Sequence, residues 1–261
     1  MKKLYDFHIH SKYSDGENSL EGIVRLAILK KISIIGFTDH SYTFFDESYC
    51  MKKEDISKYQ EEISKLKEKY KERIKILCGI EQDYYSDEST ENYDYVIGSV
   101  HYIKIGNDYI PIDDPSPSIK ETANKYFDGD VYKVVEKYYE CVADIINKTN
   151  CDFIGHFDII AQHNSDNVFF DENDERYKKI WQPVVDKLIK TNKPFEINTR
   201  PILKEIKKEP CPSNAIRKYI KENGGKFILC SDAHNKKDLC YHFQNYIGEV
   251  DGKNNKRIIR W

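Results

Sequence analysis

The chain has 261 residues, enough for one large α/β domain with a buried core, and no linker is evident, so we expect residues 1–261 to form a single domain. Charged residues make up 33% of the chain, yet the formal net charge is only −3, which argues against nonspecific nucleic-acid binding as the main activity. No apolar run approaches the roughly 18 to 20 residues needed to span a bilayer, and the N-terminal segment lacks an apolar signal core, so we expect a cytoplasmic protein with no membrane partner.

The seven cysteines form no Cys-x-x-Cys pair, and their odd number leaves at least one thiol unpaired within the chain. Cys78, Cys151 and Cys230 lie inside apolar, strand-like runs, where cysteine acts as a small hydrophobic residue. We therefore expect reduced, mostly structural thiols.

Four strands are predicted in the first half of the chain, and each ends in a side chain that can bind a metal. A helix beginning near Asn18 or Ser19 follows the first strand, and a charged helix over 54–71 follows the second. The strands and the residues at their ends are 4–10 with His8 and His10, 32–38 with His40, 74–80 with Glu81, and 93–100 with His101.

The second half continues this alternation after a stretch over 104–129 that is rich in Pro, Asp, Ser and Gly. We interpret that stretch as a long loop outside the strand–helix alternation, which could cover the entrance to a site. Helices are expected over 131–147, 175–190 and 213–222, and Pro183 predicts a kink or a later start in the second of them. The strands are 152–155 with His156, 194–197 followed by Asn198 and Arg200, and 226–230 with Asp232 and His234.

Seven strands that alternate with helices predict a parallel sheet, most simply a closed barrel. In such barrels the catalytic residues collect at the carboxyl ends of the strands. We therefore expect the polar residues at the strand ends to meet in one site.

The residues at these strand ends have the chemistry of a metal centre. Six of the eight histidines of the chain are among them, and Asp15 lies in the loop after the first strand. Nine nitrogen and oxygen ligands exceed what one ion uses, so two or three divalent ions are implied, and imidazole with carboxylate suits zinc, iron or manganese. A glutamate among histidines can bridge two ions, which favours Glu81 as the bridge. The nine candidates are His8, His10, Asp15, His40, Glu81, His101, His156, Asp232 and His234.

Six short motifs in the chain resemble those of the polymerase and histidinol phosphatase superfamily, called PHP. The length and the run over 93–101 most resemble the histidinol-phosphate phosphatases of histidine biosynthesis. The motifs are His8-x-His10, Thr38-Asp39-His40, Gly79-Ile80-Glu81, Gly98-Ser99-Val100-His101, Gly155-His156-x-Asp158 and Ser231-Asp232-Ala233-His234.

This resemblance implies a distorted (β/α)7 TIM-like barrel and a trinuclear centre. It also implies hydrolysis of L-histidinol phosphate to L-histidinol and inorganic phosphate, with a hydroxide held between two ions as the nucleophile. The implied ligand sets are His8, His10, Glu81 and Asp232 for the first ion, Glu81, His101 and His156 for the second, and Asp15, His40 and His234 for the third.

Other residues near the motifs have expected roles in catalysis or binding. Arg200 can supply a fork-shaped donor to phosphate, and Asn198 can line the pocket. Asp158 or the residues of the third set can protonate the leaving alcohol, which gives Asp158 a catalytic role beside Glu81 and Asp232. We expect Asp39 to orient an imidazole rather than bind a metal.

One segment departs from the pattern of the histidinol-phosphate phosphatases. Where they carry basic residues after the Gly-His-x-Asp motif, this chain has Ile159-Ile160-Ala161-Gln162-His163. His163 or a lysine from the loop at Lys104 could substitute.

Three alternatives to a histidinol-phosphate phosphatase stay open. The nearest is a phosphatase acting on another small phosphate monoester. A nuclease of the kind attached to polymerases is disfavoured by the lack of a polymerase and of a basic groove-forming run. A structural PHP module is disfavoured because all nine ligand positions are filled. The sequence carries no signal for an oligomeric state.

Overall fold

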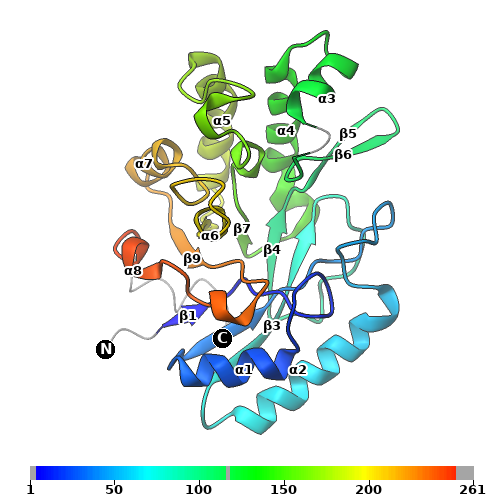
Figure 1. Cartoon of the computed structure of the whole chain (residues 1–261), viewed down its shortest axis with the longest axis vertical. Helices are drawn as coiled ribbons and strands as arrows, with labels where there is room; N and C mark the ends of the chain where they lie inside the picture. The colour runs from blue at the N-terminus through cyan, green and yellow to red at the C-terminus, as the bar shows by residue number, and fades with distance from the viewer. Residues whose placement is uncertain (1–3, 116–117, 251–261) are drawn as a thin grey trace.

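The computed structural model describes residues 4–115 and 118–250, and its centre is a sheet of seven parallel strands (Figure 1). All seven predicted strands are present and follow one another around the sheet in chain order. They are β1 (Tyr5–Asp6), β2 (Ile34–Phe37), β3 (Lys75–Asp83), β4 (Tyr95–Ser99), β7 (Phe153–Ile154), β8 (Phe195–Asn198) and β9 (Phe227–Cys230).

The sheet curves round until its first and last strands meet just beyond their ends. Ile9 and Ala233 form a parallel bridge there, in which the amide of His10 donates to the Ala233 carbonyl at 2.9 Å. The amide of Ala233 donates in turn to the His8 carbonyl at 3.1 Å. This nearly closed arrangement is the predicted distorted TIM-like barrel, and it places His8 and His10 beside Asp232 and His234.

The helices pack around the outside of the sheet, with α1 and α2 at one end of the view and α3, α4 and α5 at the other (Figure 1). Ser19 caps α1 as predicted, because its side chain accepts a hydrogen bond from the Gly22 amide. Pro183 lies inside a helix that already begins at Glu175, so the predicted later start is wrong. The longer helices are α1 (Leu20–Leu29), α2 (Ile56–Tyr70), α3 (Ile119–Tyr126), α4 (Val131–Thr149), α5 (Glu175–Ile189) and α7 (Asn214–Glu222).

Several short helices connect these elements. The α-helical ones are α6 (Arg200–Leu203) and α8 (Phe243–Tyr246), and the 3₁₀ turns are Lys53–Asp55, Ile159–Ala161, Ser165–Asn167 and Lys236–Asp238. None of the described helices is long and apolar enough to cross a membrane.

The segment over 104–129 is more regular than the excursion that we expected. β5 (Tyr102–Ile105) and β6 (Asp108–Pro111) form an antiparallel hairpin, and α3 follows it. The hairpin turns at Gly106, whose φ of +62° is a conformation that favours glycine. The hairpin extends away from the barrel (Figure 1). The alternation of strands and helices that predicts the barrel strands therefore does not predict it.

The inside of the barrel is filled by a separate apolar cluster beneath the strand ends. Tyr95 is its largest member, is 1% exposed, and donates a hydrogen bond from its hydroxyl to the Phe7 carbonyl at 2.7 Å. Gly36 on β2 and Gly79 on β3 leave room for its ring, since a Cβ at either position would lie within 3 Å of it. The cluster contains Phe7, Leu77, Tyr95, Ile97, Phe153, Ile228 and Cys230.

Candidate metal centre

The nine side chains predicted as metal ligands converge at the carboxyl end of the barrel. Eight of them come from the ends of strands, and Asp15 comes from the loop before α1. The alternating residues that follow β1 pair with the four-residue motif that follows β9, which brings His8 and His10 beside Asp232 and His234. The candidate ligands lie close together around Glu81, but their groups differ in part from the sets that the resemblance implies: His10 also approaches Asp15, and His40 Nδ1 lies 2.9 Å from Glu81 Oε2.

The first set gathers His8, His10, Glu81 and Asp232. His8 Nε2 lies 3.2 Å from Glu81 Oε2 and 3.6 Å from Asp232 Oδ1. His10 Nε2 lies 3.2 Å from Asp232 Oδ1 and 3.5 Å from Glu81 Oε2. Both rings are completely buried, so these four side chains share an enclosed space.

The second set lies on the other oxygen of the same glutamate. Glu81 Oε1 is 2.9 Å from His156 Nε2 and 3.4 Å from His101 Nε2. Glu81 therefore has histidine nitrogens at both of its oxygens, which is the arrangement required of a bridging carboxylate.

The third set is the most exposed of the three. Asp15 Oδ2 lies 3.0 Å from His234 Nε2, and Asp15 Oδ1 lies 3.8 Å from His40 Nε2. His10 belongs to this group as well, because its Nδ1 is 3.5 Å from Asp15 Oδ1. Asp15 is 32% exposed, whereas Glu81 is 1% exposed, so water reaches this set more easily.

The unpaired atoms of the site fit metal ions. Within the described residues, five buried ligand atoms that face one another lack a hydrogen bond of normal geometry. Buried polar atoms are nearly always paired, so this concentration needs an explanation. Nitrogen and oxygen ligands about 2 Å from a common ion lie about 3 Å from each other, as these atoms do. The five atoms are His8 Nε2, His10 Nε2, His40 Nδ1, Glu81 Oε2 and Asp232 Oδ1.

The electrostatics of the site keep Glu81 and His10 in the forms that bind metals, whereas neighbouring carboxylates raise the pKa values of His8, His40 and His101, which must release a proton to bind a metal. Burial raises the pKa of Glu81, but the neighbouring His8, His40 and His101 outweigh burial and hold that pKa well below its usual range. Burial lowers the pKa of His10 to about 3, and the nearby His234 and His40 add to this effect. An ionised carboxylate beside a neutral imidazole is the combination that metal binding requires.

Two buried carboxylates that the sequence analysis missed orient the histidine ligands. Glu196 accepts a hydrogen bond from His8 Nδ1 at 2.6 Å and another from the His156 amide at 2.7 Å. Asp83 lies 3.2 Å from His101 Nδ1. Because Nδ1 is used in each contact, the Nε2 atom of each ring is directed to Glu81. The available signal for Glu196 was a lone acidic residue inside an otherwise apolar strand.

Glu196→Gln should weaken metal binding by about tenfold to a hundredfold, the usual cost of losing a partner that orients a ligand. Glutamine keeps the side-chain volume of glutamate, but its NH₂ group would face either the N–H of His8 Nδ1 or the amide N–H of His156, which need an acceptor. The measurement is metal titration against a competing chelator, with the exposed Glu222→Gln as the matched control. Metal affinity equal to that of the control would show that Glu196 does not position His8.

A cavity of about 260 Å³ opens above the candidate ligands. Asn198 lines it and donates a hydrogen bond to Asp232 Oδ2 at 3.0 Å. Arg200 lines it too, with its guanidinium donating to the Asp232 carbonyl at 3.0 Å and lying against His234. Lys204, at the end of α6, is the lysine among the lining residues, and Lys104 is not among them. Lys104 instead lies over the ring of Tyr109.

Two expectations about acidic residues were wrong. Asp158 does not line the cavity, because its carboxylate accepts hydrogen bonds from the Cys211 thiol and from the Ser213 amide. It is therefore not placed to protonate a leaving group. Asp39 does not orient an imidazole; it accepts hydrogen bonds from the amides of Ser11 and Ser14 and fixes the loop that carries Asp15.

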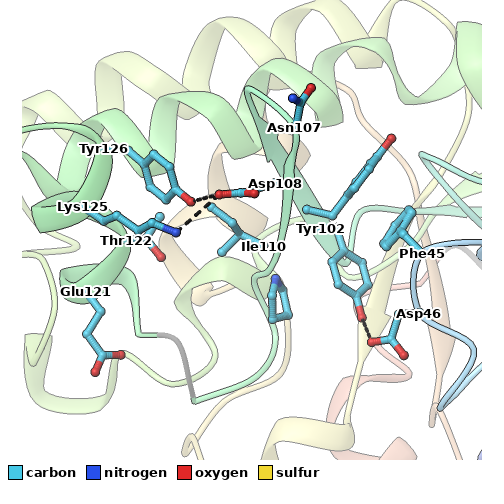
Figure 2. A pocket seen from close by; sticks show the side chains of 12 residues that line it. Phe45, Asp46, Tyr102, Asn107, Asp108, Ile110, Glu121, Thr122, Lys125 and Tyr126 are labelled. Carbon is cyan, nitrogen blue, oxygen red and sulfur yellow. Dashed lines mark hydrogen bonds and ion pairs between the residues drawn. The ribbon is translucent and has the colours of Figure 1, made fainter.

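A second cavity of about 530 Å³ lies between the β5–β6 hairpin and α3 (Figure 2). Its carboxylates already have partners: Asp46 accepts from the Tyr102 hydroxyl, and Asp108 contacts Tyr126 and Lys125. In the described part of the chain, the groups of side chains able to hold a metal lie at the strand ends and not here. The candidate chemistry therefore belongs to the smaller cavity.

Comparison with protein families agrees with this geometry. The model of the PHP domain matches residues 6–200, which is most of the chain. The chain belongs to the PHP family. The matched part of this PHP protein contains His8, His10, Asp15, His40, Glu81, His101 and His156, whereas Asp232 and His234 lie beyond it.

Two curated relatives of this PHP protein carry the name "Probable histidinol-phosphatase". The one from Schizosaccharomyces pombe is 28% identical over 192 residues, which cover 67% of this chain and 59% of the relative. The chain thus spans under two thirds of that relative. The one from Clostridium acetobutylicum is 24% identical over 267 residues, which cover 98% of this chain and 96% of the relative.

Two solved structures have the same fold as this PHP protein. The "putative histidinol phosphatase hisK" from Listeria monocytogenes has a TM-score of 0.79 at 19% identity, with 93% of this chain and 99% of that chain covered. The histidinol phosphate phosphatase from Lactococcus lactis, described as complexed with zinc, L-histidinol and phosphate, has a TM-score of 0.66 at 23% identity. That alignment covers 95% of this chain and 92% of the other.

Proposed function

We propose that this protein is a metal-dependent phosphatase that hydrolyses L-histidinol phosphate to L-histidinol and inorganic phosphate. The observation that carries the proposal is the ring of unpaired ligand atoms around Glu81, at the base of a cavity that Arg200 also lines. The names of the two curated relatives support the same activity. The zinc, L-histidinol and phosphate of the Lactococcus lactis structure support the substrate and the type of metal.

Two or three divalent ions of the zinc, iron or manganese class would be held by the three sets of ligands, with Glu81 shared between the first two. When bound, ions of this class activate water for attack and stabilise negative charge on phosphoryl oxygens. Glu196 and Asp83 keep His8 and His101 turned toward Glu81. These orienting contacts make the site preorganised rather than assembled on binding.

Arg200 is the residue best placed to hold the phosphate. One of its terminal nitrogens donates to the Asp232 carbonyl, and a guanidinium has further donors in a fixed fork. The amide of Arg200 donates to Asn198 Oδ1 at 2.9 Å, which fixes the start of α6 beside the cavity. With Asp158 directed elsewhere, the candidate acids are the members of the third set, Asp15, His40 and His234, all of which line the cavity.

Steady-state kinetics of the metal-loaded protein on a panel of phosphorylated metabolites test this proposal. We expect the highest kcat/KM with L-histidinol phosphate, and loss of turnover after treatment with a chelator. Equal or better turnover of an unrelated ester would instead identify a phosphatase for another small monoester. The departure of residues 159–163 from the family pattern makes this comparison necessary.

A further inference from the structure

The cavity above the candidate metal ligands is lined by two chemically different groups of side chains. Arg200 and Lys204, four residues apart at α6, supply positively charged donors. Asp113, Gln162 and His163 line the same cavity and come from other segments, namely the stretch after β6 and the loop after β7. We call the latter three residues the acceptor wall.

The hydrogen bonds of the acceptor wall use donor atoms of Gln162 and His163, both of which line the cavity. Gln162 Nε2 and His163 Nε2 both donate to the Asp113 carbonyl, at 2.6 and 2.9 Å. A carbonyl only accepts, so in neutral His163 the Nδ1 atom is an acceptor, as is Gln162 Oε1. Within residues 4–115 and 118–250, neither of these two atoms makes a hydrogen bond.

Asp113 adds a negative charge to this wall. The amide of Ile112 donates to the His101 carbonyl at 2.8 Å, which fixes Asp113 beside the second set of ligands. Among the described residues its carboxylate has no hydrogen bond or ion pair, although the residue is partly buried and lines the cavity. A partly buried, unpaired carboxylate next to two neutral acceptors is suited to bind a cation that carries N–H donors.

We infer that the acceptor wall binds the alcohol half of the substrate, and that Asp113 selects phosphate esters of cationic amino alcohols. This inference rests on the proposed function. Arg200 and Lys204 match the phosphate, and the acceptor wall matches an ammonium group and an imidazole N–H, both of which L-histidinol provides. Sugar phosphates offer hydroxyls without a positive charge. Gln162 and His163, which stand where the resembling phosphatases carry basic residues, then contact the leaving group and not the phosphate.

Calorimetric titration with L-histidinol tests the wall without relying on turnover. We expect Asp113→Asn, in the metal-loaded protein with phosphate present, to bind L-histidinol about tenfold to a hundredfold more weakly than wild type, the range for a lost hydrogen bond to a charged group. Asp114→Asn removes the same charge from the next, exposed residue, and should bind like wild type. L-histidinol binding by Asp113→Asn as tight as that by Asp114→Asn would overturn the inference.

Kinetics with two esters separate this inference from the proposed function. In Asp113→Asn the ratio of kcat/KM for L-histidinol phosphate to kcat/KM for p-nitrophenyl phosphate should fall by at least about tenfold. An unchanged ratio would overturn the role of Asp113 while leaving the phosphatase intact. Absence of hydrolysis in the wild type, together with weakened L-histidinol binding in Asp113→Asn, would refute the proposed function and support the acceptor wall.

Discussion

Glu81→Gln should lower kcat/KM for phosphate-ester hydrolysis by about a thousandfold or more, because several kcal/mol of transition-state stabilisation depend on correctly held ions. Both oxygens of Glu81 face histidine nitrogens, so one substitution disturbs the first two ligand sets together. The amide would also place an NH₂ group against one of those ring nitrogens. Metal content should therefore fall along with activity.

The measurement combines steady-state kinetics with metal analysis of the purified variant. Glu91→Gln, at an exposed position, changes the same functional groups away from the site and should behave like wild type. A Glu81→Gln protein that keeps full metal content and activity would contradict the bridging role. Loss of activity with full metal content would place the role of Glu81 in the reaction rather than in metal retention.

Gly79→Ala should destabilise the protein by about 3 kcal/mol and lower its Tm by roughly 6 to 12 °C. A Cβ at this position would lie 2.5 Å from Tyr95 Cζ and 2.8 Å from Thr38 Cγ2. Neither neighbour can move easily, because the Tyr95 hydroxyl donates a hydrogen bond to the Phe7 carbonyl and the Thr38 hydroxyl accepts one from the Ile9 amide. The backbone is held too, since the Gly79 carbonyl accepts a hydrogen bond from the Tyr59 hydroxyl at 3.0 Å.

Gly248→Ala is the matched control for this prediction. It also adds one Cβ, but no atom lies within 4 Å of that position, so its Tm should stay close to that of wild type. Thermal unfolding of the two variants side by side measures the cost of the contact with Tyr95. Equal Tm values for the two variants would mean that the barrel interior relaxes around Tyr95.

The strands and their metal-binding ends were predictable because both signals are local. An apolar run followed by His or Glu needs only a few residues to recognise, and parallel strands place such ends together whatever connects them. The grouping of Asp15 with His40 and His234 required the family resemblance, because nothing in the loop itself assigns it to one ion. The structure brings all three together as expected.

The residues that sequence reasoning missed or misplaced act through contacts between distant segments. Glu196 meets His8 across the barrel, and Asp158 meets Cys211 and Ser213, so no local spacing reveals either contact. Alternation along β8 does predict that Glu196 and Asn198 share one face of the strand, opposite Ile197. A charged residue on the inner face of a buried strand was therefore a usable signal for Glu196.

The bridge between Ile9 and Ala233 has a consequence for how the protein matures. Of the candidate ligands in the first set, His8 and His10 lie near the start of the described chain and Asp232 near its end, whereas Glu81, His101 and His156 belong to its middle. A ribosome must therefore release the segment through Asp232 before the first set can exist, although the second set can form earlier. Long-range contacts of this kind form slowly. Binding of a metal ion to the first set would therefore require the barrel to have closed. A bound ion would then stabilise the contact between the first and last strands.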